Sequence, residues 1–413
     1  MLYAVLISGV SAAPLDLDSP ALSLASRWVA WKARFALHDG GADDAASFGK
    51  FAATDALIAS HNALGLPWTL GHNHFSDLTP GEFRARYLMP PGAPHSAMAA
   101  MADLAVVNNA TELPLAPASV DWVAQGVFPP VKNQGSCGSC WAFATVGAVE
   151  SAYVIGGGNL TALSEQDLVS CSRTATSDGC KPYWAHSAFQ WIHAHGLATA
   201  RSYPYTSSGG RVAACASAKR DAPAVGVARY TSVPRGDEEA LVAAAALTPV
   251  TVMVDCTTLR SYRSGIVDNP ACGTDLNHIV IVAGYGTANG TDYYKVRNSW
   301  SEAWGEAGYI RMVRGKNMCG IATTNVYPTG VAPWTPVPTP PTPPTPPTPP
   351  PPPAPTPPPA PTPTPGEQLY LCLPEASGAF ACQETSDPRG HSLATCRAEL
   401  KCYKPPSPLA AYM

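Results

Sequence analysis

Apolar residues near the start of the chain recur every three or four positions, which is the spacing of one helix face. Two such runs are separated by Gly40 and Gly41, a pair that disfavours a continuous helix. The apolar positions are Trp28, Trp31 and Phe35 in the first run, and Phe48, Phe51, Ala52, Leu57 and Ile58 in the second. The pattern predicts two helices between Trp28 and about Tyr87.

The pattern changes within the middle of the chain. Its first half keeps the helical spacing over residues 141–153 and 165–169. Its second half alternates as strands do over residues 279–283, 292–296 and 309–313. A helical half beside a strand-rich half predicts an α+β unit, which we place at residues 116–330.

Composition marks off other segments. Residues 90–117 lose periodicity and collect Pro, Ala, Met and Asn, which is typical of an exposed, cleavable connector. Residues 331–366 are almost wholly Pro and Thr, which cannot bury a core and favour a stiff, extended spacer. Residues 367–413 are rich in cysteine and predict a small disulfide-linked module with three possible pairings. Its cysteines are Cys372, Cys382, Cys396 and Cys402.

The first 13 residues combine a short apolar stretch with the small residues Ser11, Ala12 and Ala13. This arrangement predicts a signal peptide. A positively charged start is missing, so a mis-started or truncated N-terminus is the alternative. Asn-x-Ser/Thr triplets that could be glycosylated in the secretory pathway begin at Asn109, Asn159 and Asn289.

Charge and cysteine content limit the classes of function. The chain has 413 residues, of which 46% are hydrophobic and 14% charged, with a net charge of -4. This balance argues against nucleic-acid binding, and no later apolar run is long enough to span a bilayer. Twelve cysteines imply an oxidising compartment. Their spacings do not suit a zinc site, so we expect no metal and no cofactor.

One cysteine stands where a thiol becomes reactive. Cys140 directly precedes an apolar, helix-forming run, and unpaired N–H groups at a helix N-terminus favour thiolate over thiol. Catalysis also needs a base. His278 begins a predicted strand and Asn298 follows another, so both side chains could meet the thiol across a cleft.

Other interpretations of these residues exist. Cys137 and Cys140 have the spacing of a redox motif, of half a zinc site, or of two ordinary disulfide half-cystines. His278 alone would be read as a core histidine with its hydrogen bonds satisfied. A redox motif would need a thioredoxin-type unit, and a zinc site would need a second ligand pair; neither is evident. The joint occurrence of cysteine, histidine and asparagine favours catalysis.

Longer motifs around these residues are specific. They are Gln134-Gly-Ser-Cys-Gly-Ser-Cys140-Trp-Ala-Phe143, Asn277-His278, and Asn298-Ser299-Trp300 followed by Trp304-Gly305. Together they resemble the papain family of cysteine proteases, in its cathepsin L-like group, from residue 116 to about 328. The resemblance implies a two-lobed catalytic domain with a helical lobe and an antiparallel β-barrel lobe, working as a cysteine endopeptidase.

The resemblance also assigns catalytic roles. Cys140 would be the nucleophile, and His278 would form the ion pair with it and protonate the leaving amine. Asn298 would orient the imidazole through its side-chain oxygen, under the cover of Trp300. The side-chain N–H of Gln134 and the backbone N–H of Cys140 would form the oxyanion hole, where one donor contributes roughly 3 kcal/mol.

Substrate specificity in this family depends mainly on the pocket for the second residue before the scissile bond, here called the second-position pocket. By resemblance its lining includes Trp184, Ala185, Met253, Ile279 and, at its base, Thr324. A neutral base predicts apolar residues over arginine, because a buried guanidinium would lack a charge partner. Met253 should shorten the pocket and favour Leu or Val over Phe.

Two positions on the cleft depart from the family. Lys181-Pro182-Tyr183 replaces the usual Asn-Gly-Gly, so Tyr183, which should pair with substrate through its backbone, is expected to narrow the rim. Ser301 replaces the glycine that normally follows Asn298-Ser299-Trp300.

The family pattern pairs the remaining cysteines of the catalytic unit. It joins Cys137 with Cys180, Cys171 with Cys215, and Cys272 with Cys319, which leaves Cys140 free. Cys256 has no partner in this pattern. We expect it to be buried and inert, with a regulatory thiol as the alternative.

Residues 14–115 resemble the inhibitory propeptide of the same family. Residues 71–77 fit its Gly-x-Asn-x-Phe-x-Asp motif, and Phe51, Ile58 and Asn62 keep the end of its helical ERFNIN motif. Asp43 and Ser47 replace the Glu and Arg of that motif, which predicts fewer charged contacts. Acid should trigger maturation near residues 113–116, through carboxylates such as Asp77 whose pKa would be depressed in the folded prodomain.

The Pro/Thr spacer and the cysteine-rich tail most resemble the kinetoplastid branch of the family. This resemblance implies a secreted or lysosomal monomer that acts on proteins and peptides and that cystatin-type inhibitors block. Two other classes stay open. One is an inactive homologue that binds through its tail, and the other is a disulfide-exchange protein.

Overall fold

The computed structural model describes residues 17–19, 21–35, 44–89, 106–107, 115–173, 179–181, 183–220, 224–335, 369–374 and 380–385. The chain divides into two compact units, Met1–Pro338 and Thr339–Met413. The predicted signal peptide, Asp43, Asn109, Pro182 and most of the Pro/Thr spacer lie outside the described residues.

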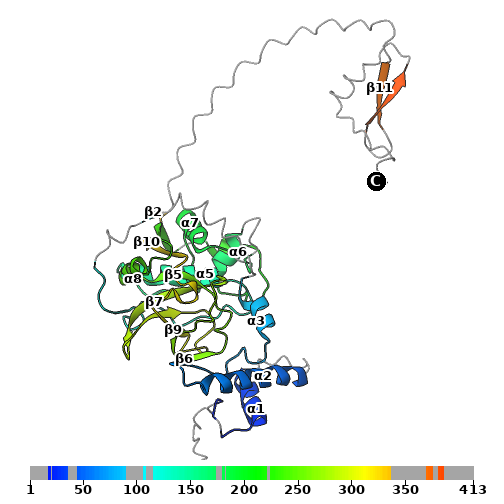
Figure 1. Cartoon of the computed structure of the whole chain (residues 1–413). Coiled ribbons are helices and arrows are strands. Elements are labelled where there is room, and N and C mark those ends of the chain that lie inside the picture. Colours follow the sequence, from blue (N-terminus) through cyan, green and yellow to red (C-terminus); the bar gives the residue numbers. More distant parts are fainter. Residues whose placement is uncertain are drawn as a thin grey trace, which may run out of the picture. The chain divides into compact units, whose positions relative to one another are not determined.

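Figure 1 shows how the helices of the first unit are arranged. They are α1 (Leu24–Phe35), α2 (Asp44–Asn62), α3 (Pro80–Tyr87), α5 (Cys140–Ile155), α6 (Glu165–Cys171), α7 (Ala185–His195) and α8 (Glu238–Leu247), with the 3-10 turns η3 (Ser217–Arg220) and η4 (Met318–Gly320). Helix α3 starts with a capping box in which Thr79 and Glu82 satisfy each other's backbone N–H. Helix α5 is buried along most of its length, and Gly147 gives it room against Ile281.

A large sheet runs through the same unit. Its strands are β1 (Trp68–Leu70), β2 (Val106–Val107), β3 (Val120–Asp121), β4 (Val225–Ser232), β5 (Val250–Val254), β6 (Tyr262–Val267), β7 (His278–Ala288), β8 (Thr291–Arg297), β9 (Tyr309–Val313) and β10 (Asn325–Pro333). They follow the order β1-β6-β9-β8-β7-β5-β10-β4-β2, with β3 beside β7. Most neighbours are antiparallel, but β6 with β9 and β2 with β4 are parallel.

Two apolar clusters fill the catalytic unit. One gathers around Tyr262, Trp300 and Trp304 of the strand-rich half. The other packs α5, α6 and α7 around residues such as Trp141 and Phe189. The predicted helices and strands of the middle segment are present, and the fold is the expected α+β arrangement of a helical and a strand-rich part.

A third, smaller cluster builds the N-terminal segment. Trp28 stacks on Trp31 with ring centroids 5.2 Å apart, and both lean on Phe51 of α2. The two predicted helices are therefore confirmed, whereas β1 and α3 were not predicted. In the described residues charged contacts persist through other pairs, since Arg27 lies 2.9 Å from Asp55.

Strand β1 joins this N-terminal segment to the catalytic unit. It pairs antiparallel with β6, where Trp68 lies opposite Gly265. The side chain of Asn62 holds β1 from α2 through two reciprocal hydrogen bonds of 2.9 Å to the backbone of Leu70. Asn73 adds a hydrogen bond of 2.9 Å from its side-chain amide to the carbonyl of Arg260.

The C-terminal unit contains one described hairpin. Strand β11 (Leu369–Pro374) pairs antiparallel with β12 (Phe380–Thr385), and Cys372 lies opposite Cys382 in the register. Cys396 and Cys402 fall outside the described residues, so the three possible pairings of the tail stay open. Among the residues described, no helix is long and apolar enough to cross a membrane.

Candidate active site

Cys140 is the first residue of the buried helix α5. A tight loop delivers it there, because Gly138 passes so close to Cys180 that an added Cβ would lie 2.4 Å from the carbonyl oxygen. The structure contains the disulfides Cys137–Cys180, Cys171–Cys215 and Cys272–Cys319, the three pairs that the resemblance implied. Within the described residues the free cysteines are Cys140 and Cys256, both buried.

His278 begins β7, and Asn298 follows β8 directly. Nε2 of His278 lies 2.8 Å from Oδ1 of Asn298. Because this oxygen can only accept, Nε2 carries the proton and Nδ1 of the neutral ring is the basic nitrogen. Nδ1 is buried and has no hydrogen-bond partner among the described residues. Trp300 stacks on the imidazole, with ring centroids 4.5 Å apart, and covers the hydrogen bond.

The thiol and the imidazole belong to different parts of the fold, and one backbone N–H beside the histidine links them. The N–H of Ile279, the residue after His278, acts on the thiol of Cys140 together with the N–H of Trp141. The start of β7 therefore carries both the imidazole that bonds Asn298 and the N–H that acts on Cys140 at the start of α5.

Burial sets the protonation state of this pair. It raises the pKa of the Cys140 thiol to about 11, although the surrounding backbone N–H groups lower it. It also lowers the pKa of His278 to about 4, against the opposing effect of the hydrogen bond that His278 donates to Asn298. Both side chains are completely buried. In this precursor form, burial therefore favours the neutral thiol and the neutral imidazole, and it opposes the effect of the helix N-terminus.

The amide of Gln134 is held beside the cysteine. Ser299 donates a hydrogen bond of 2.6 Å to its Oε1, so its Nε2–H₂ group is directed to the other side. Nε2 donates to the carbonyl of Cys137 at 2.9 Å and, at 3.4 Å, to the carbonyl of Tyr87. A carbonyl of the N-terminal segment thus lies at the donor that the resemblance assigned to the oxyanion hole.

Residues before, within and after α3 pack beside the site. Met89 is buried and its N–H donates to the carbonyl of Asn277 at 2.7 Å, next to His278. Phe75 and Phe83 meet Trp300 edge-on, each with ring centroids 5.3 Å apart. Residues of the N-terminal segment therefore bond the residue before His278 and pack on the ring that covers the imidazole.

A cavity matches the second-position pocket. Its lining residues are Trp184, Ala185, His186, Thr251, Val252, Met253, Ile279, Thr324 and Val326. All five residues that the resemblance placed there are present. His186 was missed, although its position directly after Ala185 on α7 was a signal for it.

Tyr183 is not among the residues that line this cavity. Its ring packs edge-on against Trp141, with centroids 5.0 Å apart, and its hydroxyl bonds Ser187. The side chain is therefore anchored to the helical part of the molecule beside the cysteine.

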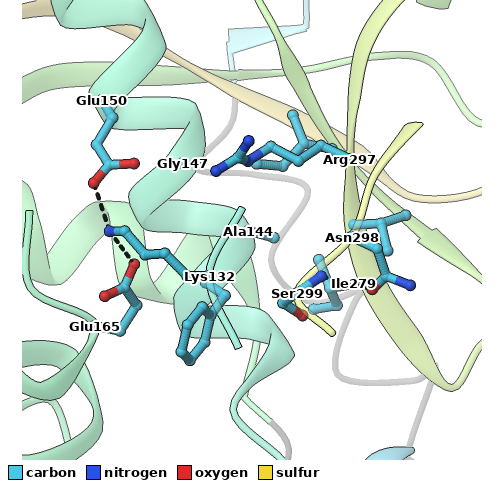
Figure 2. A pocket seen from close by; sticks show the side chains of 12 residues that line it. Lys132, Ala144, Gly147, Glu150, Glu165, Ile279, Arg297, Asn298 and Ser299 are labelled. Atoms are coloured by element: carbon cyan, nitrogen blue, oxygen red, sulfur yellow. Dashed lines mark hydrogen bonds and ion pairs between the residues drawn. The ribbon is translucent and has the colours of Figure 1, made fainter. Parts of the chain in front are cut away.

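An ionic cluster behind the site was not found from the sequence (Figure 2). The ammonium group of Lys132 lies 2.7 Å from Glu150 and 2.6 Å from Glu165. It borders a small cavity that Asn298 and Ser299 also line. Burial raises the pKa of Glu165 to about 7, whereas the two carboxylates, against burial, raise the pKa of Lys132. The signal was Glu150, an acidic residue within the otherwise largely apolar helix α5.

The titrating groups of the N-terminal segment differ from prediction. Burial raises the pKa of Asp77, so the predicted depressed pKa was wrong. Burial instead lowers the pKa of His72, whose Nε2 lies 3.0 Å from Asp55, and lowers that of His74 to about 4.

Two of the predicted glycosylation triplets lie at the surface of the molecule. Asn159 and Asn289 are exposed, as glycosylation requires, whereas Asn109 lies outside the described residues. In the part of the chain that the structure describes, no group of three or more His, Cys, Asp or Glu could hold a metal ion.

Known proteins share this arrangement. Residues 116–329 match the family described as papain family cysteine protease. A probable cysteine protease, RD21B, of Arabidopsis thaliana is 40% identical over 296 residues, which make up 70% of this chain but 62% of that protein. A structure of a stem bromelain precursor has a TM-score of 0.66 and 35% identity, covering 74% of this chain and 98% of that one. The structure of procathepsin L 3 from Tenebrio molitor larval midgut has a TM-score of 0.66 and 34% identity, covering 74% and 99%. The chain belongs to the papain family of cysteine proteases.

Proposed function

We propose that this chain is the precursor of a cysteine endopeptidase, with Cys140 as nucleophile and His278 as base. The observation that carries the proposal is the polarity of the imidazole. Asn298 holds the proton of His278 on Nε2, so Nδ1 is the basic nitrogen. The backbone N–H of the next residue, Ile279, acts on the thiol of Cys140.

The reaction follows from these positions. His278 takes the thiol proton, and the sulfur of Cys140 attacks the peptide carbonyl carbon. Gln134 and the backbone N–H of Cys140 stabilise the oxyanion. His278 then gives its proton to the leaving amine as the C–N bond breaks. Water, deprotonated by His278, hydrolyses the thioester and restores the thiol.

The N-terminal segment acts as an inhibitor in this proposal. Residues 14–115 form the propeptide after removal of a signal peptide at 1–13, and the mature enzyme starts near Ala116. Tyr87 accepts a hydrogen bond from Gln134, the proposed oxyanion donor, and Met89 donates one to Asn277, the residue before His278. Substrate therefore cannot enter the site. The two precursor structures that resemble this chain support the assignment.

Substitution of the two free cysteines tests the function. In the matured protein under thiol-reducing conditions, Cys140→Ala should lower kcat/KM for a generic peptide by about a thousandfold or more, because it removes the nucleophile. Cys256→Ser should change it little, since Cys256 makes none of the contacts described for the site. Equal loss in both variants would contradict the assignment. A wild-type protein that reduces insulin without cleaving peptides would instead indicate disulfide exchange, and one that does neither would indicate an inactive binding homologue.

We propose that the enzyme prefers substrates with an apolar residue in the second-position pocket. Matched peptides should show leucine preferred over arginine there by at least about tenfold, because no charge partner awaits a guanidinium. Thr324→Glu should raise cleavage of the arginine peptide. An arginine peptide cleaved by the wild type as well as the leucine peptide would show that another acidic group reaches the pocket.

We also make proposals for the cellular location of the protein, its partners and its branch of the family. A secretory route to a lysosome-like compartment or to the outside agrees with the cysteine content and the exposed sequons. We propose a monomer that cystatin-type inhibitors block. The likeness to kinetoplastid enzymes depends on the spacer and tail alone, whereas the relative named above is a plant protein.

A further inference from the structure

The two groups proposed to stabilise the oxyanion belong to different segments of the chain. One is the side-chain amide of Gln134, in the loop before α5, and the other is the backbone N–H of Cys140, at the start of α5. Both N–H groups must lie within hydrogen-bond reach of a single oxygen atom. The loop between them contains Gly135 and Gly138, whose backbones are intrinsically free, so contacts from elsewhere in the fold are needed to hold the two donors at a fixed separation.

The hydroxyl group of Tyr205 connects these two segments. It donates a hydrogen bond of 2.8 Å to the backbone carbonyl of Gln134. Because its only hydrogen is used in that bond, it accepts from the hydroxyl of Ser139, whose Oγ lies 2.9 Å away. Ser139 directly precedes Cys140, and the peptide bond between them carries the Cys140 N–H. One oxygen atom therefore joins the residues that place both oxyanion donors.

Residues of the catalytic unit hold Tyr205 itself in place. Its ring packs edge-on against Phe143 of α5, with ring centroids 4.9 Å apart. The backbone N–H of the residue that follows it donates to the side chain of Gln166 in α6 at 2.7 Å. Further along the same loop, the carbonyl of Ser208 accepts from the N–H of Ser136 at 2.7 Å. None of these partners belongs to the propeptide, so the position of Tyr205 does not depend on it.

The phenol does not itself exchange protons during the reaction. Burial raises the pKa of Tyr205 above its ordinary value, although the hydrogen bond from Ser139 opposes this effect. The hydroxyl therefore keeps its hydrogen at neutral and acid pH, and both of its hydrogen bonds keep their direction. Any effect of Tyr205 on the reaction is an effect on position.

We propose that Tyr205 is a positioning residue for the oxyanion site, which acts through Gln134 and Ser139 and does not touch the substrate. Its hydroxyl sets the separation between the amide of Gln134 and the N–H of Cys140. The inference rests on the proposed function, because it assumes that these two donors bind the carbonyl oxygen of the scissile bond.

The test compares two reactions of the same thiol in matured Tyr205→Phe, which loses the hydroxyl but keeps the ring against Phe143. Cleavage of the leucine peptide forms an oxyanion, so kcat should fall at least about fivefold while KM stays within about twofold. Alkylation by iodoacetamide forms none, because the sulfur of Cys140 attacks the methylene carbon and iodide leaves. Its rate should stay within about twofold of the wild type. A merely structural defect would lower both rates together.

Two further variants accompany this comparison. Ser139→Ala breaks the same connection at its other end and should show the same pattern, and its hydroxyl makes no capping hydrogen bond to α5 that would be lost as well. Tyr203→Phe is the matched control, because it removes a hydroxyl two residues away that accepts from the N–H of Ala216 at 3.0 Å. It should leave kcat and the alkylation rate unchanged.

The Gln134→Ala background shows whether Tyr205 acts through the oxyanion site. With one donor gone, the separation of the pair no longer matters, so adding Tyr205→Phe should lower kcat by less than about twofold more. A full further loss in this background would overturn the inference, and so would equal falls in kcat and alkylation rate in folded Tyr205→Phe. If Tyr205→Phe does not fold, Ser139→Ala decides by the same criteria. A wild type that does not cleave the leucine peptide would overturn the proposed function and this inference with it, whereas wild-type cleavage with an unchanged kcat in Tyr205→Phe would overturn the inference alone.

Discussion

Asn298 controls the imidazole through a single oxygen atom. Its Oδ1 accepts from Nε2 of His278 at 2.8 Å and from the N–H of Ser299 at 2.7 Å. The second bond fixes the amide, so the oxygen cannot turn away from the ring. The tautomer of His278 is thus decided by a neighbour that does not itself touch the reacting atoms.

Replacement of this neighbour should slow the reaction without abolishing it. In Asn298→Ala the imidazole loses its fixed tautomer and orientation, and kcat should fall by about a hundredfold while KM changes little. Asn298→Gln, which keeps the amide, should fall less. Kinetics of both variants with one apolar peptide give the answer, and an unchanged kcat in Asn298→Ala would contradict the role.

Ser301 is strained where the family has glycine. Its φ is 64°, in the left-handed region that disfavours residues with a Cβ, and its N–H bonds the carbonyl of Lys132 at 3.1 Å. Ser301→Gly should therefore raise the free energy of unfolding of the matured enzyme by about 1 kcal/mol, the relieved strain exceeding the added freedom of the unfolded chain. Denaturant titration measures this change. Ser301→Ala, which keeps the Cβ, is the control and should give no increase.

Two histidines of the prodomain have a lowered pKa, which predicts that acid weakens its folded state. The pKa of His74 is about 4 in the folded precursor against an ordinary value of 6.5, and that of His72 is lowered too. The unfolded prodomain therefore binds protons more tightly than the folded one. The free energy of unfolding that these histidines contribute is fully present above about pH 6.5, and it declines as pH falls toward the pKa of the folded state. The loss for His74 amounts to about 3 kcal/mol at most. Asp77, with a raised pKa, acts in the opposite direction.

His74→Phe should consequently move self-processing to lower pH. The substitution keeps a ring against Phe75, whose centroid lies 3.9 Å from that of His74, but removes the titrating nitrogen. The measurement is the fraction of precursor cleaved near residue 116 as a function of pH, with a downward shift of about half a unit or more expected. His61→Phe, a partly exposed histidine of the same prodomain, is the control. An unchanged profile in His74→Phe, or processing of a Cys140→Ala precursor without added protease, would contradict acid autoactivation by this route.

Sequence patterns predicted the elements whose signal is local. Strand β9 was placed at its observed bounds and α5 within a few residues, because the residue pattern of each follows a single period. Strand β1 could not be predicted, since three residues carry no period and their partner Gly265 lies far along the chain. The site was predicted from its motifs. The pKa directions of Cys140 and Asp77 were not, because both depend on burial in the folded protein, which a sequence pattern does not show.

At the scale of the whole molecule, the tail is a compact unit of its own. Thr339–Met413 forms a unit separate from Met1–Pro338, and every residue proposed for catalysis and for the second-position pocket belongs to the latter. A chain ending at Pro338 should therefore mature and cleave small peptides with a kcat/KM within about twofold of the full chain. Side-by-side kinetics of the two forms test this, and a loss of peptide cleavage on truncation would show that the tail takes part in the site.

Maturation changes the sheet as well as the cleft. The order of strands begins with β1 and ends with β2, and both precede residue 116. Cleavage there turns β6 and β4 into edge strands, with backbone N–H and C=O groups that no strand satisfies, and such edges invite pairing with other extended chains. The N–H of Ile266 in β6 donates to the carbonyl of Pro67 at 3.2 Å, so amide hydrogen exchange at Ile266 should accelerate on propeptide removal. The precursor is then protected twice, against its own catalysis and against strand-to-strand association.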